Sequence, residues 1–176
     1  MIGSTILTLR RTLPSDLDYV MALESAPENR PFVGQWDRSM HLAAMESSNF
    51  LHLVAEDVER RPVGYVIMTD LNDLSHSVLL KRIVIEAKGR GYGHEVMRLV
   101  KRLAFEQLGA HRLWLDVIES NPRAKHLYET EGFRVEGLLR ESFYRDGKYQ
   151  SKHLMAILGS EHEAISTQDA ASATPA

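Results

Sequence analysis

The segment Lys88-Gly89-Arg90-Gly91-Tyr92-Gly93 lies between an apolar run at residues 78–85 and an amphipathic run that follows it. The apolar run has the length and composition of a buried strand, and the amphipathic run has the three-to-four-residue spacing of a helix. Glycines let a backbone approach a ligand closely, and the first turn of a helix leaves amide donors unpaired. The segment is therefore predicted to bind a phosphate group through main-chain amides at a helix N-terminus.

The composition is that of one ordinary globular domain. The 176 residues are 44% hydrophobic and 26% charged, which is enough for one sizeable core. No apolar run approaches the roughly 20 residues that span a bilayer, and the N-terminus lacks the pattern of a secretory signal. We expect a cytoplasmic domain at residues 1–159 with no membrane partner. The absence of cysteine excludes disulfides, thiolate metal ligands and cysteine nucleophiles.

The charge is distributed unevenly along the chain. A net charge of −3 argues against a general nucleic-acid-binding protein, so no nucleic-acid partner is expected. Seven of the 21 basic residues nevertheless gather around the glycine segment: Lys81, Arg82, Lys88, Arg90, Arg98, Lys101 and Arg102. This local excess favours a polyanionic ligand. For Lys101 and Arg102 we favour a simpler interpretation, in which they form the solvated face of the helix.

The remaining elements follow from periodicity and from turn residues. Strands are expected over residues 5–9, 50–56, 63–68, 78–85, 111–118, 133–144 and 148–158. Helices are expected over about residues 15–25, 37–45, 93–108 and 121–131, the last with Asn121 as its cap and Pro122 in its first turn. Residues 160–176 are rich in Ala, Ser and Thr without a period, so a disordered C-terminal tail is predicted.

The glycine segment alone leaves several classes of ligand site open. A nucleotide-hydrolase loop would close as Gly-Lys-Ser or Gly-Lys-Thr, whereas this one closes as Gly91-Tyr92-Gly93-His94, which excludes that class. A dinucleotide-binding domain remains an alternative, since Asp116 follows a strand where a ribose-binding acid would be sought. A metal site is not predicted, because His94 has no second histidine at the spacing of a zinc helix.

A second motif lies downstream and pairs with the first. Asn121 opens a helix that ends in Tyr128-Glu129-Thr130-Glu131-Gly132-Phe133. With both motifs, the chain resembles over most of its length the GNAT superfamily of N-acetyltransferases, in particular the branch of ribosomal-protein N-terminal and spermidine acetyltransferases. The loop motif of that family, Arg/Gln-x-x-Gly-x-Gly/Ala, maps onto Lys88, Gly91 and Gly93, with lysine in place of the usual first residue.

The resemblance implies an α/β (α+β) single-domain fold. Its mixed sheet of about seven strands would splay between the fourth and fifth strands, with about four helices around it. The implied activity moves acetyl from acetyl-CoA directly to a primary amine, which could belong to a polyamine, a peptide N-terminus or a small molecule. The alternative to an enzyme is a non-catalytic module that binds or senses acyl-CoA. The resemblance also implies a homodimer.

The resemblance assigns roles to individual residues. The residues implied to bind acetyl-CoA are Ile83, Val84, Ile85, Lys88, Gly89, Arg90, Gly91, Tyr92, Gly93, His94 and Asn121. Tyr128 is implied to be the catalytic acid; its position on the helix alone would favour a core tyrosine, and the motif reverses that preference. Glu24 and Glu28 belong to the acceptor-side segment, and neither is assigned as a base because helix carboxylates are usually solvated. Trp36 either lines the acceptor pocket or packs beneath it.

Overall fold

The computed structural model describes residues 1–86 and 89–172, so Lys88 lies outside the described residues. The strands are β1 (Ile2–Gly3), β2 (Leu7–Arg11), β3 (Phe50–Asp57), β4 (Pro62–Thr69), β5 (Ser77–Ile85), β6 (Arg112–Ile118), β7 (Arg134–Arg145) and β8 (Lys148–Leu158). The α-helices are α1 (Leu17–Ser25), α2 (Arg38–Glu46), α3 (Tyr92–Arg102), α4 (Pro122–Thr130) and α5 (Gly159–Ser172). Across the described ranges, no helix is both long and apolar enough to cross a membrane.

The strands form one mixed sheet in the order β1-β2-β3-β4-β5-β6-β8-β7. Neighbours are antiparallel except β5 and β6, which run parallel and, within the described residues, pair only from Ser77↔Arg112 to Leu79↔Trp114. Beyond Leu79 the two strands diverge, which confirms the predicted splay. The four antiparallel strands β2 to β5 also distinguish this sheet from the parallel sheet of a dinucleotide-binding domain.

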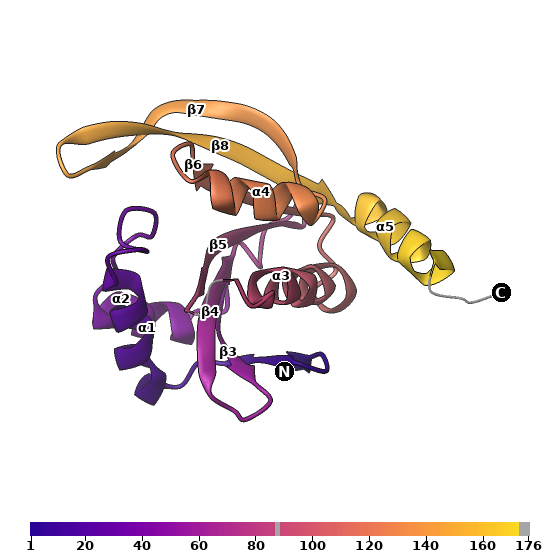
Figure 1. Cartoon of the computed structure of the whole chain (residues 1–176), viewed down its shortest axis with the longest axis horizontal. Coiled ribbons are helices and arrows are strands. Elements are labelled where there is room, and N and C mark those ends of the chain that lie inside the picture. Colours follow the sequence, from indigo (N-terminus) through magenta and orange to yellow (C-terminus); the bar gives the residue numbers. More distant parts are fainter. Residues whose placement is uncertain (87–88, 173–176) are drawn as a thin grey trace.

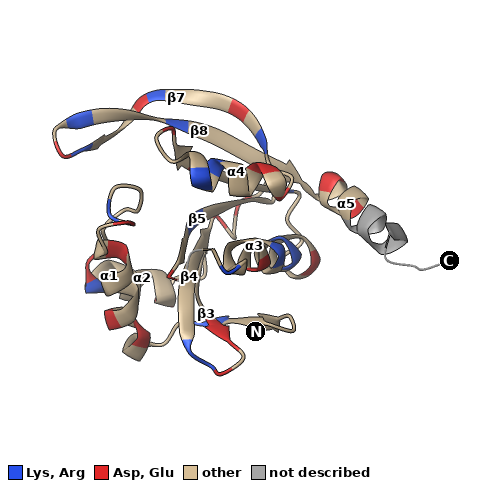
Figure 2. Ribbon diagram, in the orientation of Figure 1, with Lys and Arg blue, Asp and Glu red and all other residues tan. Residues whose placement is uncertain are grey.

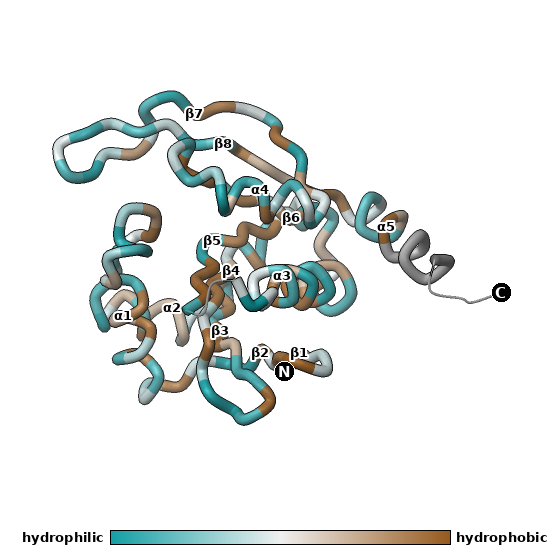
Figure 3. Tube along the Cα trace, viewed as in Figure 1, coloured by the Kyte–Doolittle hydropathy of each residue, from teal (hydrophilic) through white to brown (hydrophobic). Residues whose placement is uncertain are grey.

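Helices cover both faces of the sheet (Figure 1). The pair α1 and α2 lies on one side of strands β3 to β5, and α3 lies on the other side. Apolar residues concentrate in these central strands (Figure 3), because β4 is buried on both faces. The larger core cluster includes Val96 and Val100 of α3, whereas a smaller cluster on the other face joins Val20 and Leu23 to Tyr65.

The two ends of the chain differ from the sequence prediction. At the N-terminus, Ile2–Gly3 pairs with β2 and makes an eighth strand that is too short to show a period. At the C-terminus, Gly159–Ser172 forms α5 where a disordered tail was expected. The Glu161 side chain accepts a hydrogen bond from the Leu158 amide at 3.0 Å, as in a capping box, and His162 stacks on Phe105 at 5.0 Å between ring centroids. Residues 173–176 lie outside the described residues.

Lys101 corrects a second expectation. It was interpreted as part of the solvated face of α3, but it is only 4% exposed. Its Nζ donates to Oε2 of Glu131 at 2.9 Å and to the Glu131 carbonyl at 2.7 Å, at the C-terminal end of α4. Arg102, its neighbour, is exposed as expected. The buried ion pair therefore fixes α3, which follows the glycine segment, against the helix that carries Tyr128.

Replacing Lys101 should test this link. We expect Lys101→Met to lower the free energy of unfolding by about 3 kcal/mol, because the buried Glu131 carboxylate loses its main counter-charge. Urea unfolding followed by circular dichroism measures this difference. Arg102→Met is the matched control, and its change should stay within about 0.5 kcal/mol. Equal effects of the two variants would contradict the assigned role of Lys101.

Candidate active site

Two glycines of the segment are required by the backbone. Gly89 has φ +86° and Gly91, the N-cap of α3, has φ +77°, a region that other residues enter only with strain. A Cβ at either position would meet no atom of the described structure within 4 Å, so the backbone there faces open space. The first turn of α3 thus presents its unpaired amides to a ligand, as the sequence predicts.

A cavity of about 690 Å³ opens beside this turn, between the end of β5 and α4. Of the residues predicted to bind acetyl-CoA, it is lined by Ile83, Val84, Ile85, Gly89, Gly91, Gly93, His94 and Asn121. In the described part of the chain, Arg90 and Tyr92 belong to the same turn but lie outside this lining: Arg90 is exposed, and Tyr92 packs against the larger core. Arg123, in the basic first turn of α4 (Figure 2), adds a cation to the wall.

A second cavity, of about 240 Å³, lies where β5 and β6 diverge. Its lining includes Trp36, which also packs against the smaller core cluster. The two cavities share a wall, which is formed by Phe32, Val33, Ile83, Val84, Asn121, Ala124 and Tyr128. The molecule therefore has two adjoining compartments that meet over β5 and α4.

Tyr128 is the one titratable side chain among the described residues that lines both cavities. It is 8% exposed, and its ring packs at 6.1 Å from that of Phe133, so it is also a core residue. Burial, and after it the negative charge of Asp116, raises the pKa of its phenol above the usual value of 10. The hydroxyl consequently keeps its proton throughout the neutral pH range.

Asn121 caps α4, as the sequence predicts. Its side-chain oxygen accepts a hydrogen bond from the Ala124 amide at 3.2 Å. Because the capping residue also lines both cavities, the same interaction fixes the start of α4 and one part of the shared wall.

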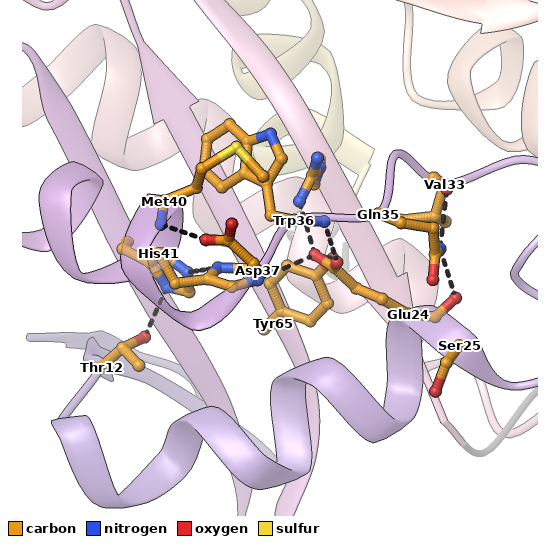
Figure 4. A network of polar contacts seen from close by, with 12 residues as sticks. Thr12, Glu24, Ser25, Val33, Gln35, Trp36, Asp37, Met40, His41 and Tyr65 are labelled. Atoms are coloured by element: carbon orange, nitrogen blue, oxygen red, sulfur yellow. Dashed lines mark hydrogen bonds and ion pairs between the residues drawn. The ribbon is translucent and has the colours of Figure 1, made fainter.

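Glu24 is a residue that sequence reasoning left unassigned as a solvated helix carboxylate. It is 1% exposed and anchors a buried polar network (Figure 4). Its Oε1 accepts from Arg82 Nη1 at 2.5 Å and from the Tyr65 hydroxyl at 2.6 Å, while its Oε2 accepts from the Trp36 amide at 3.1 Å. The guanidinium of Arg82 in turn lies 4.1 Å from the centroid of the Trp36 ring. Glu28, by contrast, is exposed and lines the larger cavity.

Two histidines extend this network away from the cavities. Nε2 of His41 lies 3.4 Å from Glu24 Oε1, and its Nδ1 lies 3.0 Å from Nε2 of His52, whose Nδ1 is 2.8 Å from the Thr12 hydroxyl. Burial, and then the neighbouring His41, lowers the pKa of His52 to about 4. Burial alone would raise the pKa of Glu24, but its hydrogen bonds to His41 and Tyr65 and the charge of Arg82 hold it below the usual value.

This network has no sequence signature, because its members come from segments that are far apart in the sequence. Its structural effect is to hold the Arg82 side chain and the Trp36 ring in fixed positions on the wall of the smaller cavity. Over the described ranges, no group of three or more metal-ligating side chains is placed to hold a metal ion.

The comparison with known protein families matches residues 17–133 to the family described as the acetyltransferase (GNAT) family. The spermidine N(1)-acetyltransferase of Vibrio cholerae is 29% identical over 167 residues, which cover 89% of this chain and 95% of that protein. The enzyme of the same name from Escherichia coli K12 is 27% identical over 166 residues, which cover 89% and 88%.

A solved structure has the same fold. The crystal structure of the Vibrio cholerae spermidine N-acetyltransferase in complex with CoA and spermine matches with a TM-score of 0.82 and 27% identity. The match covers 89% of this chain and 98% of that one.

The lowered pKa of the buried His52 leads to a pH dependence of stability. Between pH 4 and 6.5 the unfolded chain binds a proton at His52 that the folded protein does not, so stability falls as the pH falls through this window. From pH 7 to pH 5 we expect His52 to account for a loss of about 2 kcal/mol in the free energy of unfolding. Urea titrations at both pH values measure it.

The matched control is His52→Gln, which keeps hydrogen-bonding groups but cannot titrate. Its loss of stability between pH 7 and pH 5 should be smaller than that of the unmodified protein by about the same amount. An identical pH dependence in both proteins would mean that His52 is not buried in its neutral form.

Proposed function

Since the chain belongs to the GNAT family and is an acetyl-CoA-dependent N-acetyltransferase, we propose that it transfers acetyl directly to a primary amine while both substrates are bound. Acetyl-CoA occupies the larger cavity, and the acceptor amine occupies the smaller one. The observation that carries this proposal is the position of Tyr128, whose side chain belongs to the wall that the two cavities share.

The glycine turn and β5 supply the acetyl-CoA site. The pyrophosphate is held by amides at the first turn of α3, where Gly89 and Gly91 allow the backbone to face the ligand. Past Leu79, β5 has no pairing with β6 in the described chain, so its main-chain groups are available to the amides of the pantetheine arm. A main-chain amide near Ile85 donates to the thioester oxygen as negative charge develops on it.

Tyr128 completes the proton balance of the transfer. The amine attacks the thioester carbonyl, the carbon–sulfur bond breaks, and the thiolate leaves with a proton from the Tyr128 hydroxyl. Solvent takes one proton from the ammonium form before the attack and a second from the nitrogen after it, and it returns one proton to the Tyr128 phenolate, so the tyrosine is restored. The raised pKa of Tyr128 keeps the donor protonated over the working pH range.

The acceptor belongs to the class of primary amines. Both curated relatives compared above are spermidine acetyltransferases, and the Vibrio cholerae crystal structure holds spermine. A cytoplasmic location and a homodimer stay predictions for this chain.

Removing the Tyr128 hydroxyl tests the proposal. In a thiol-release assay with acetyl-CoA and a panel of primary amines, Tyr128→Phe should lower kcat by about a hundredfold. The KM for acetyl-CoA should change little, because the ring and its packing stay in place. Tyr19→Phe is the control, since Tyr19 bonds to Glu86 and does not belong to either described lining. Unchanged kcat in Tyr128→Phe would remove the tyrosine from the mechanism.

The glycine turn generates a separate prediction. Gly91→Ala should weaken acetyl-CoA binding about tenfold, because an alanine at positive φ shifts the backbone and displaces the amides. Calorimetric titration with acetyl-CoA measures the effect. Gly147→Ala is matched, since Gly147 has φ +78° in the β7–β8 turn and, like Gly91, has no described atom within 4 Å of an added Cβ. We expect similar losses of stability in both variants but weaker binding in Gly91→Ala alone.

A further inference from the structure

The smaller cavity has an excess of positive charge. Its described lining holds three basic side chains, Lys81, Arg82 and Lys152, and one acidic side chain, Asp116. A polyamine brings several positive charges of its own, and a site for such a ligand is expected to offer carboxylates. The smaller cavity instead has more basic than acidic side chains, so its charge does not match that expected of a site for spermidine, the substrate for which the relatives are named.

The charges of this cavity are compensated unequally. Arg82 donates to the buried Glu24, and Nζ of Lys152 lies 3.0 Å from Asp116 Oδ1. In the part of the chain that the structure describes, Lys81 forms no ion pair. Lys81 is exposed overall, but partial burial of its side chain lowers the pKa of the ammonium group; the charges of Arg82 and Lys152 lower it further, and Asp116 and Asp70 oppose them. An anion bound beside Lys81 would relieve this unfavourable environment.

A β-bulge places Lys81 in the cavity. Ile67 of β4 pairs with Arg82 and Met68 pairs with Leu80, so Lys81 is the extra residue of β5. Consecutive side chains of a regular strand point to opposite faces, whereas a bulge redirects one of them. Lys81 and Arg82 accordingly line the same cavity, with Nζ of Lys81 5.8 Å from the centroid of the Trp36 ring against which Arg82 also lies.

The residues around Arg82 pack closely on their side of the cavity. A Cβ at Gly34 would lie 2.7 Å from Nη2 of Arg82, so a larger residue there would collide with the guanidinium. With Glu24 and Trp36 holding Arg82 in place, Lys81 remains the cation available to a ligand. The cavity volume of about 240 Å³ lies below the roughly 300–1,000 Å³ of sites for drug-sized ligands, and it fits a molecule of amino-acid size.

Resting on the proposed transfer to a primary amine, we propose that the acceptor is a small amine that carries an anionic group, held by Lys81 in the smaller cavity. The anionic group is a carboxylate or a phosphate, and both have the charge and the acceptor oxygens that an ammonium group binds. Lys81 is then a specificity-determining residue, and a polyamine is disfavoured by the positive charge of the lining.

A matched set of amines tests this proposal. Butylamine, 4-aminobutyrate and 1,4-diaminobutane share one reacting amine and differ at the far end, which is neutral, anionic or cationic. With acetyl-CoA in the thiol-release assay, kcat/KM should be at least tenfold higher for 4-aminobutyrate than for 1,4-diaminobutane. Ethanolamine and O-phosphoethanolamine form a second pair, and a larger gain in that pair would identify phosphate as the preferred anion.

Variants at Lys81 test whether this residue causes the preference for an anionic amine. In Lys81→Gln, kcat/KM for 4-aminobutyrate should exceed that for 1,4-diaminobutane by less than threefold. In Lys81→Glu, the cationic substrate should have the higher kcat/KM. Lys148→Gln is the matched control, because Lys148 is exposed on the β7–β8 hairpin. This variant should keep the kcat/KM ratio of the unmodified protein. A loss of the ratio in both glutamine variants would show an unspecific effect and overturn the role of Lys81.

A binding measurement separates this inference from the proposed function. In the presence of CoA, 4-aminobutyrate or O-phosphoethanolamine should raise the melting temperature more than 1,4-diaminobutane does, and Lys81→Gln should remove the difference. If amines are acetylated but the cationic one is preferred, the transfer stands and the anionic acceptor is wrong. If the anionic ligands bind through Lys81 and no amine is acetylated, the site stands and the proposed transfer is wrong.

Discussion

The site depends on a sheet that stops pairing partway along two of its strands. β5 and β6 are held together through three residue pairs and then separate, while each keeps its antiparallel neighbour, β4 or β8. Unpaired main-chain groups are costly inside a protein unless a ligand or water satisfies them. The divergence thus creates a space and, along one of its walls, a row of backbone groups that suits an extended amide-bearing ligand. The glycine turn and α3 follow directly at the end of β5, so the anion site continues the same edge.

The proposed acceptor side depends on a different kind of constraint. Arg82 is buried in a wall where a lone cation would be unstable, and Glu24 of α1 compensates its charge across the sheet face. The carboxylate also binds the Trp36 amide, so one buried ion pair connects α1, the loop before α2 and β5. Because Arg82 and Trp36 line the smaller cavity, its shape is fixed by charge pairing beneath it and not only by packing.

Sequence reasoning succeeded where a feature is encoded by consecutive residues. The glycine turn, the Asn121 cap and the two closing strands each follow from local backbone chemistry, and the motif spacing led to the family. It failed where the decisive partner is distant in sequence. Nothing near Lys101 shows that Glu131 will bury it, and Glu24 is distinguished from a solvated carboxylate by partners that lie 12 to 58 positions away. The helix after Leu158 was missed because its composition resembles that of a disordered tail and its docking residues are few.

The same distinction between local and distant determinants decides which properties of the site can be inferred from related proteins. The proposed acetyl-CoA side is built mainly from backbone groups, which a common fold reproduces even at 27% identity. The acceptor side is built from side chains, whose charge can change without any change of fold. In this chain the bulge at Lys81 brings a second cation beside Arg82, while Glu24 and Asp116 are already engaged in ion pairs. The fold therefore accounts for the proposed acetyl-CoA site, whereas the proposed choice of acceptor rests on the charge of a few side chains in one cavity.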